Sequence, residues 1–211
     1  MLAANQCDGI ISSSHNLGIE DYEKVEAPIV AFDRNLAPKI PIISSDNFEG
    51  GRLAAKALVK AGCQHIVMIT GYDNSDSPTG LRQLGFNYEL DKQGIICPVP
   101  NDLSLMRREM EIKSIISREH PDGIFVSDDL TAILVMKVAK HLGLSIPDDL
   151  KIIGYDGTAF IRHFHSELAT IQQPLEEIAK LCVEILLKKI KGEPVNRDYV
   201  LPVNLISGDS I

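Results

Sequence analysis

The segment Ile40–Thr70, IPIISSDNFEGGRLAAKALVKAGCQHIVMIT, decides the fold class of the chain. It begins with a short apolar strand, continues through an amphipathic helix over Phe48–Ala61 and ends in a second apolar strand. Apolar residues from Leu53 to Ala61 fall on one helical face, and Gly62 follows where a helix stop is expected. Strand, helix and strand in this order predict an α/β fold with parallel sheets.

The same alternation continues along the rest of the chain. Apolar runs predict strands at Gly9–Ser13, Ile29–Phe32, Ile40–Ser44, His65–Thr70, Gly94–Pro98, Gly123–Ser127, Lys151–Gly154 and Tyr199–Leu205. Helical spacing predicts further helices over Pro78–Lys92, Leu103–Arg118, Leu130–Leu142 and Pro174–Lys191. No Gly/Ser linker separates two halves, so two subdomains would have to be joined by more than one crossing of the chain.

Composition and charge narrow the class of protein. The chain has 211 residues, of which 45% are hydrophobic, and this is enough to bury a sizeable core. The formal net charge is -8. The densest basic run, Lys188–Lys191, lies where the last predicted helix ends, so its positive charges are explained by the negative end of the helix dipole. We therefore do not expect these residues to bind nucleic acid themselves.

The cysteines and the apolar runs indicate in which cellular compartment the protein is expected. Cys7, Cys63, Cys97 and Cys182 form no CxxC pair, so neither a zinc site nor a disulfide framework is predicted. No apolar run approaches the roughly 18 residues of a membrane span, and Met1–Cys7 has neither a basic start nor an apolar stretch. A reducing, cytoplasmic location without membrane attachment is expected.

Acidic residues follow several of the predicted strands. They are Asp33, the pair Asp128 and Asp129, Asp156, and the run Asp73–Asp76. In open parallel sheets ligands bind beyond the carboxyl ends of the strands, so these side chains are candidate ligand contacts. Helix N-caps occupy the same places, and for each aspartate a capping role is the alternative.

Taken together with Arg82, the acidic residues suit a particular kind of ligand. Carboxylates and one guanidinium converging on a cleft would accept and donate hydrogen bonds to vicinal hydroxyls. A neutral sugar or polyol is the ligand expected. A phosphorylated or carboxylated ligand would be repelled by the acidic lining unless further cations were present.

A set of short motifs, in order along nearly the whole chain, resembles the lactose/galactose repressor family of transcription regulators. The motifs are Val30–Arg34, Ser45–Ala54, Ile69–Gly71, Arg82–Phe86, Val126–Asp129, Ile152–Gly157, Thr170–Pro174 and Leu201–Val203. The resemblance implies two doubly wound, parallel-sheet subdomains of the periplasmic-binding-protein-like type, with the effector bound between them. It places the crossovers near Ser45, Gln173 and Pro202. The implied N-subdomain is residues 1–45 with 174–202, and the implied C-subdomain is residues 46–173 with 203–211.

The resemblance also implies site residues. Asp33, Arg82 and Asp156 match positions that hold effector hydroxyls, and Asp128 stands where many members carry Asn or Asp. Weaker candidates are Ser13, Asp76, Leu103 and Gln173. Leu103 replaces an aromatic residue that stacks on the ligand in several members, and Asp76 replaces a basic residue of the purine-responsive members. A nucleobase effector is accordingly not expected.

Motifs of enzymes and metal sites are missing from the sequence. Gly50-Gly51 lacks the Lys and Ser/Thr of a phosphate loop, and we expect it to pack closely against the opposite subdomain. His163 and His165 are two residues apart and would not face one metal ion. Ser12–Ser14 lacks a nucleophile elbow. We expect no enzyme, no cofactor and no metal.

The family begins with a helix-turn-helix head and with strands that this sequence does not contain. The resemblance therefore implies a sensing core with an N-terminally incomplete N-subdomain, which would reach operator DNA only through the missing head. It also implies a homodimer, and an exposed sheet edge that pairs with another chain. The alternative function is a solute-binding protein of a sugar transporter, which has the same fold.

Overall fold

The computed structural model describes residues 7–13, 21–22, 24–71 and 80–211. These residues divide into two compact units. Among them, unit 1 takes the residues up to Asp46 with Pro174–Pro202, and unit 2 takes the residues from Asn47 to Gln173 with Val203–Ile211. The described chain crosses between the units after Asp46, after Gln173 and after Pro202.

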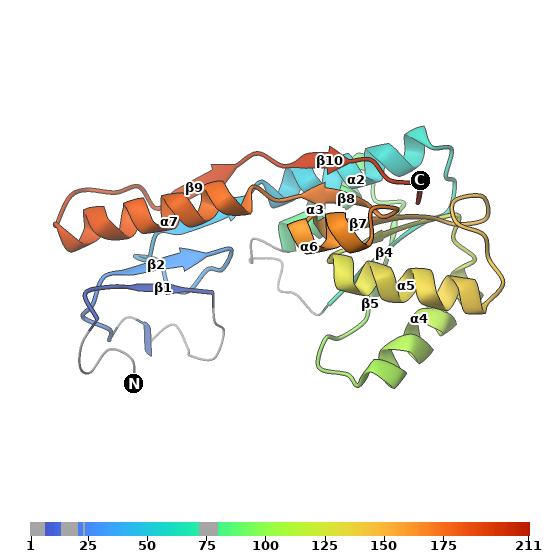
Figure 1. Cartoon of the computed structure of the whole chain (residues 1–211), viewed down its shortest axis with the longest axis horizontal. Helices are drawn as coiled ribbons and strands as arrows, with labels where there is room; N and C mark the ends of the chain where they lie inside the picture. Colours follow the sequence, from blue (N-terminus) through green and yellow to red (C-terminus); the bar gives the residue numbers. More distant parts are fainter. Residues whose placement is uncertain (1–6, 14–20, 23, 72–79) are drawn as a thin grey trace. The chain divides into compact units, whose positions relative to one another are not determined.

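Unit 1 is built on a four-stranded parallel sheet. Its strands are β1 (Ile10–Ser12), β2 (Ile29–Phe32), β3 (Ile42–Ser45) and β9 (Asp198–Leu201), and they lie in the order β1-β2-β3-β9. Helix α7 (Leu175–Ile190) packs along this sheet (Figure 1). Within the described residues β1 ends the sheet, and Ile11 is 44% exposed there.

The two faces of this sheet bury different side chains because residues alternate along a strand. Val30 and Ile43 pack against Ile178, Cys182 and Ile185 of α7. Strand residues whose side chains point to the opposite face form a second cluster with apolar residues of the loop between β2 and β3. The strand residues are Ile29, Ala31 and Ile42, and the loop residues are Leu36, Ala37 and Ile40. The sheet of unit 1 is thus covered on both faces.

Unit 2 holds a six-stranded sheet in the order β10-β8-β7-β6-β4-β5. Its strands are β4 (Ile66–Thr70), β5 (Ile95–Pro98), β6 (Gly123–Val126), β7 (Lys151–Asp156), β8 (Ala169–Gln172) and β10 (Asn204–Ile206). All neighbours are parallel except β10, which is antiparallel to β8. Its helices are α2 (Asn47–Lys60), α3 (Gly80–Glu89), α4 (Leu105–Glu119), α5 (Asp129–His141) and α6 (Ala159–Phe164).

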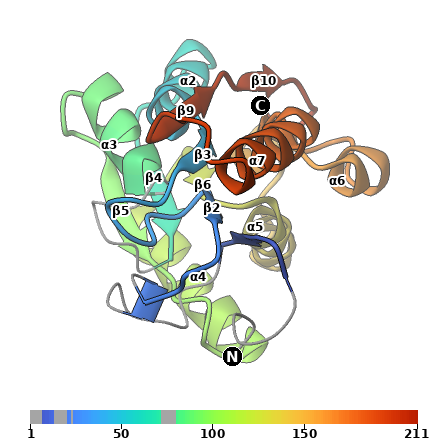
Figure 2. The ribbon, with the colours of Figure 1, turned by 90° about the vertical axis from the view of Figure 1, so that its left-hand side faces the viewer.

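Helices cover both faces of the unit 2 sheet (Figure 2). On one face Leu58 of α2 and Phe86 of α3 pack with Phe125 and Tyr155 of the sheet. On the other face α4 and α5 place Ile112 and other apolar residues against β4, β6 and β7. Parallel strands with helices on both sides define a doubly wound α/β sheet, which confirms the predicted fold class.

The prediction of one final strand over Tyr199–Leu205 is wrong. Two strands lie there, and they belong to different units: β9 pairs with β3 of unit 1, and β10 pairs with β8 of unit 2. Pro202 lies between them and lacks the backbone N–H that a continuous ladder needs. The short strand β8 and the one-and-a-half-turn helix α6 were not predicted, because their apolar patterns are too short to stand out.

The expectation for Gly50-Gly51 is also wrong, because both glycines pack inside unit 2. A Cβ on Gly50 would lie 2.7 Å from the Tyr155 ring, and a Cβ on Gly51 would lie 2.0 Å from the carbonyl oxygen of Arg82. Reciprocally, a Cβ on Gly85 would lie 1.9 Å from the carbonyl oxygen of Phe48. Glycines at these places let the backbones of α2 and α3 touch, and this contact fixes where Arg82 lies.

Candidate functional site

Polar side chains gather at the carboxyl edge of the unit 2 sheet. Asp128 follows β6, Asp156 ends β7, Gln173 follows β8, and Arg82 lies in the first turn of α3. Asp156 is in register with Gln172 of the neighbouring strand, which places Gln173 directly beside it. Three adjacent strand ends and one helix therefore contribute to a single polar cluster.

Arg82 is the centre of the cluster. It is only 5% exposed, its Nε donates to Asn47 Oδ1 at 2.7 Å, and its Nη1 donates to the carbonyl oxygen of Ser127 at 2.6 Å. Its Cζ lies 3.6 Å from the centre of the Tyr155 ring, a cation–π arrangement. The guanidinium is held on its edge and on its face, so its orientation is fixed before any ligand arrives.

Asp156 is the partner of this guanidinium. Its Oδ1 lies 4.0 Å from Arg82 Nη1 and accepts a hydrogen bond from Gln173 Nε2 at 2.7 Å. Burial raises the pKa of the Asp156 carboxyl to about 7, with Arg82 opposing the shift and Asp129 adding to it. The group therefore titrates near neutral pH.

Backbone strain singles out two of the predicted residues. Asp156 has φ 125° and Asp33 has φ 49°, both in the region that favours glycine. Such conformations persist where surrounding contacts impose them, and they cluster at ligand sites. Neither residue caps a helix of the described part of the chain, since α6 begins after Thr158, whose Oγ accepts from Ile161 N.

Asp128, by contrast, is the N-cap of α5. Its Oδ1 accepts from the backbone N–H of Thr131 at 2.8 Å, and its Oδ2 accepts from the Thr131 hydroxyl at 2.7 Å. Arg108 Nη2 donates in turn to Thr131 Oγ1. The capping role considered for this residue is present, and an effector contact would be additional to it.

Asp129 is one of the acidic candidates that follow the predicted strands, but it is not among the site residues that the family resemblance implies. It is 1% exposed, and its carboxylate accepts from the Thr170 hydroxyl at 2.6 Å and from Gly157 N–H at 2.7 Å. Burial raises its pKa to about 6. It ties β7 and β8 to α5 beneath the cluster, a role that only the tertiary structure reveals.

The remaining predicted residues lie elsewhere. Asp33 follows β2 and Ser13 follows β1, so both stand at the carboxyl edge of the unit 1 sheet, where Asp33 N–H donates to the Ile43 carbonyl oxygen at 2.9 Å. Leu103 is half-buried in the turn before α4 of unit 2. Asp76 lies outside the described residues.

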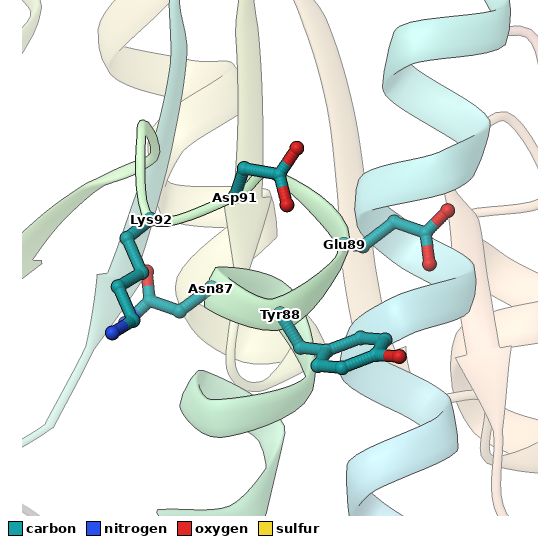
Figure 3. Close-up of a pocket in the computed structure, with 5 residues that line it drawn as sticks. All are labelled: Asn87, Tyr88, Glu89, Asp91 and Lys92. Atoms are coloured by element: carbon teal, nitrogen blue, oxygen red, sulfur yellow. The ribbon is translucent and has the colours of Figure 1, made fainter.

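Other features of the described residues do not add to the cluster. A surface pocket of about 450 Å³ is lined by the last residues of α3 and the turn after it, where Tyr88 and Glu89 point toward α2 (Figure 3). Arg52 of α2 bonds Glu89 at 3.0 Å and lies over the Tyr88 ring. The described residues contain no group of three or more metal-ligating side chains, and none of their helices is long and apolar enough to cross a membrane.

Comparison with known proteins identifies the domain family to which this fold belongs. The model of the periplasmic binding protein-like domain matches residues 55–211. A crystal structure of a periplasmic binding protein/LacI transcriptional regulator from Alkaliphilus metalliredigens, complexed with D-xylulofuranose, superposes with a TM-score of 0.82 and 33% identity, covering 96% of this chain and 77% of that one. The fold is thus that of a periplasmic binding protein-like domain.

Sequence relatives are repressors. The sucrose operon repressor of Streptococcus mutans is 63% identical over 211 residues, which is all of this chain and 66% of that protein. The ribose operon repressor of Halalkalibacterium halodurans is 32% identical over 202 residues, or 94% of this chain and 61% of that protein. The chain belongs to the LacI family of transcriptional regulators and corresponds to its effector-binding core. It spans about two thirds of the length of these relatives, and they do not favour the transporter alternative.

Proposed function

We propose that this chain senses a sugar for a repressor of a sucrose-utilisation operon, and that it regulates transcription and catalyses no reaction. The observation that carries the proposal is the Arg82–Asp156 pair at the carboxyl edge of the unit 2 sheet, held by fixed neighbours. Asp33, at the carboxyl edge of the unit 1 sheet, stays a predicted effector contact. The relatives named for sucrose and ribose operons support a sugar as the class of effector.

The chemistry of the cluster favours a neutral sugar. Arg82 supplies N–H donors, while Asp156 and Asp128 supply acceptors, and this combination matches vicinal hydroxyls. The negative charges of Asp129 and Asp128 both raise the pKa of the Asp156 carboxyl, and the positive charge of Arg82 lowers it. A phosphate group would meet more negative than positive charge in this cluster.

Partners of the whole regulator follow from the same proposal. The sugar would shift the populations of two states of the core, and a helix-turn-helix head would convert that shift into a change of operator affinity. A homodimer in the cytoplasm is the expected form. Exposed apolar side chains on unit 2, among them Phe160 and Phe164 of α6 and Met106 and Met110 of α4, support a dimer surface there.

The first prediction tests the role of Arg82 in sugar binding. Arg82→Ala should abolish the rise in melting temperature that the best of sucrose, fructose, glucose and ribose gives the unmutated protein, because the hydroxyls lose a charged donor worth about 1.5 to 3 kcal/mol. Differential scanning fluorimetry and titration calorimetry measure this. Sucrose 6-phosphate is included, and a response to it alone would overturn the assignment to a neutral sugar.

The matched control is Arg118→Ala, which removes an exposed arginine that pairs with Glu119 at the end of α4. It should leave the sugar response unchanged. An Arg82→Ala protein that still responds fully would remove Arg82 from the site. A protein that responds to none of the sugars would contradict the proposed function.

A further inference from the structure

Two residues of the candidate site lie where the chain crosses between the units. Asn47 is the first residue of unit 2 after the crossover at Asp46, and Gln173 is the last before the crossover at Pro174. Asn47 bonds Arg82, and Gln173 bonds Asp156. The two side chains that carry the proposed function are thus each tied to a different crossover.

Asn47 sets the orientation of Arg82. Its side chain is fully buried at the start of α2, and its Oδ1 accepts from Arg82 Nε at 2.7 Å and from the Tyr155 hydroxyl at 3.3 Å. One carbonyl oxygen therefore aligns both the guanidinium and the aromatic ring on which the guanidinium stacks. Loss of this oxygen would leave a buried, charged N–H without that acceptor and would remove the hydrogen bond from the Tyr155 hydroxyl.

Gln173 sets the orientation of Asp156 in the same way. The side chain donates to Asp156 Oδ1 at 2.7 Å, and the backbone N–H donates to the Asp156 carbonyl oxygen at 3.0 Å. Gln173 is 8% exposed. Two bonds from one residue thus hold Asp156, whose backbone is in a strained conformation.

We propose that Asn47 and Gln173 are positioning residues, which hold Arg82 and Asp156 in the orientation that binds sugar and couple that orientation to the backbone at two crossovers. The inference rests on the proposed function. Its consequence is that the conformation of the crossovers and the affinity for sugar change together, as thermodynamic linkage requires. A substitution at either residue then alters affinity even if its side chain never touches the sugar.

The Asn47 side of the proposal is tested with Asn47→Ala and Asn47→Asp. Asparagine and aspartate both offer Oδ1 to Arg82, and alanine does not, so only alanine should release the guanidinium. The expected result is about tenfold faster hydrogen exchange at Arg82 Nε–H by ¹⁵N NMR and about tenfold weaker sugar binding in Asn47→Ala. Asn47→Asp should restore slow exchange and most of the affinity.

Ser210→Ala is the matched control for loss of stability. Ser210 is a buried polar residue of unit 2 whose hydroxyl accepts from Ala169 N–H and donates to the Ile152 carbonyl oxygen. It should lower the melting temperature without changing Arg82 exchange or sugar affinity. Equal effects of Ser210→Ala and Asn47→Ala on exchange would overturn the positioning role, as would failure of Asn47→Asp to restore it.

The Gln173 side is tested by titration of the Asp156 carboxyl, followed by ¹³C NMR. Asp156 faces Arg82, Asp128 and Asp129 besides Gln173, and the hydrogen bond from Gln173 favours its charged form. Gln173→Ala should therefore raise the pKa of Asp156 and shift the loss of sugar affinity on acidification to higher pH. An unchanged titration would overturn this half of the proposal.

The NMR measurements need no ligand, so the two proposals fail separately. If none of the sugars binds the unmutated protein, the proposed function fails while Arg82 exchange and Asp156 titration still decide the positioning roles. If sugar binds and the variants behave like Ser210→Ala, the positioning proposal fails and the proposed function stands.

Discussion

Asp129 shows how a single residue can serve the structure at an electrostatic cost. Its carboxylate lies against Gly154, where a Cβ would be 2.2 Å from Asp129 Oδ1, and it accepts from Thr170 and Gly157. Desolvation outweighs these hydrogen bonds and raises its pKa to about 6. The folded protein therefore holds this proton at a pH where the unfolded chain has released it.

The sign of the pH dependence follows from that difference. The stability contributed by protonated Asp129 is fully present below the unfolded pKa of about 4 and is lost as the pH rises through about 6. We predict that between pH 5 and pH 8 the free energy of unfolding of the unmutated protein falls relative to that of Asp129→Asn, by roughly 1.4 kcal/mol, because one of the two pKa units lies above pH 5. Urea unfolding at several pH values measures the difference, and parallel pH profiles for the two proteins would contradict it.

At the scale of elements, the contact between α2 and α3 decides where Arg82 lies. Gly51 and Gly85 face the backbone of the opposite helix, with no room for a Cβ at either. Asn47 begins one of these helices and Arg82 lies in the first turn of the other, so the hydrogen bond between them depends on how closely the helices approach.

Gly85→Ala should therefore separate the two helices. We predict a loss of stability of roughly 1 to 3 kcal/mol from overpacking, together with weaker sugar binding because Asn47 and Arg82 move apart. Chemical unfolding and calorimetry measure the two effects. Gly143→Ala, at a positive-φ turn with open space around the glycine, is a comparison that should cost stability through backbone strain and leave binding intact. A Gly85→Ala protein with normal stability and affinity would show that the close approach is not needed.

At the scale of the whole molecule, the proposed dimer depends on apolar side chains that unit 2 leaves in solvent. Phe160 and Phe164 are 60% and 62% exposed, and their rings lie 4.8 Å apart on α6. Two exposed, adjacent aromatic rings are typical of an interface centre. We predict that Phe160→Ser with Phe164→Ser weakens self-association at least tenfold, as measured by sedimentation equilibrium.

The control for that measurement is Leu187→Ser, which changes an exposed apolar residue of α7 in unit 1. It should leave the association of the chain unchanged. A protein that is monomeric at all concentrations, or a double variant that associates as well as the unmutated chain, would contradict a dimer surface on α6.

Some of the site was predictable because it depends on local rules. Asp128 and Asp156 lie at the ends of predicted strands of continuous apolar residues, and the carboxyl ends of parallel strands meet at one edge whatever the details of packing. The same rules located most strands within two residues of their observed ends and placed the helix stop at Gly62, which has φ 90°. The site residues themselves stay predictions, since their contact with a sugar is untested.

By itself, then, the sequence determined the α/β class, the family and the strand ends at which polar side chains collect, because periodicity and short motifs act over neighbouring residues. Only the tertiary structure decided that a second strand, β10, follows Pro202 and pairs with β8, that Gly50 and Gly51 pack within unit 2, and that Asn47 and Gln173 hold Arg82 and Asp156. Asn47 and Arg82 are 35 positions apart, and Gln173 and Asp156 are 17 apart. Contacts over such separations arise from the packing of whole elements, and no pattern of neighbouring residues encodes them.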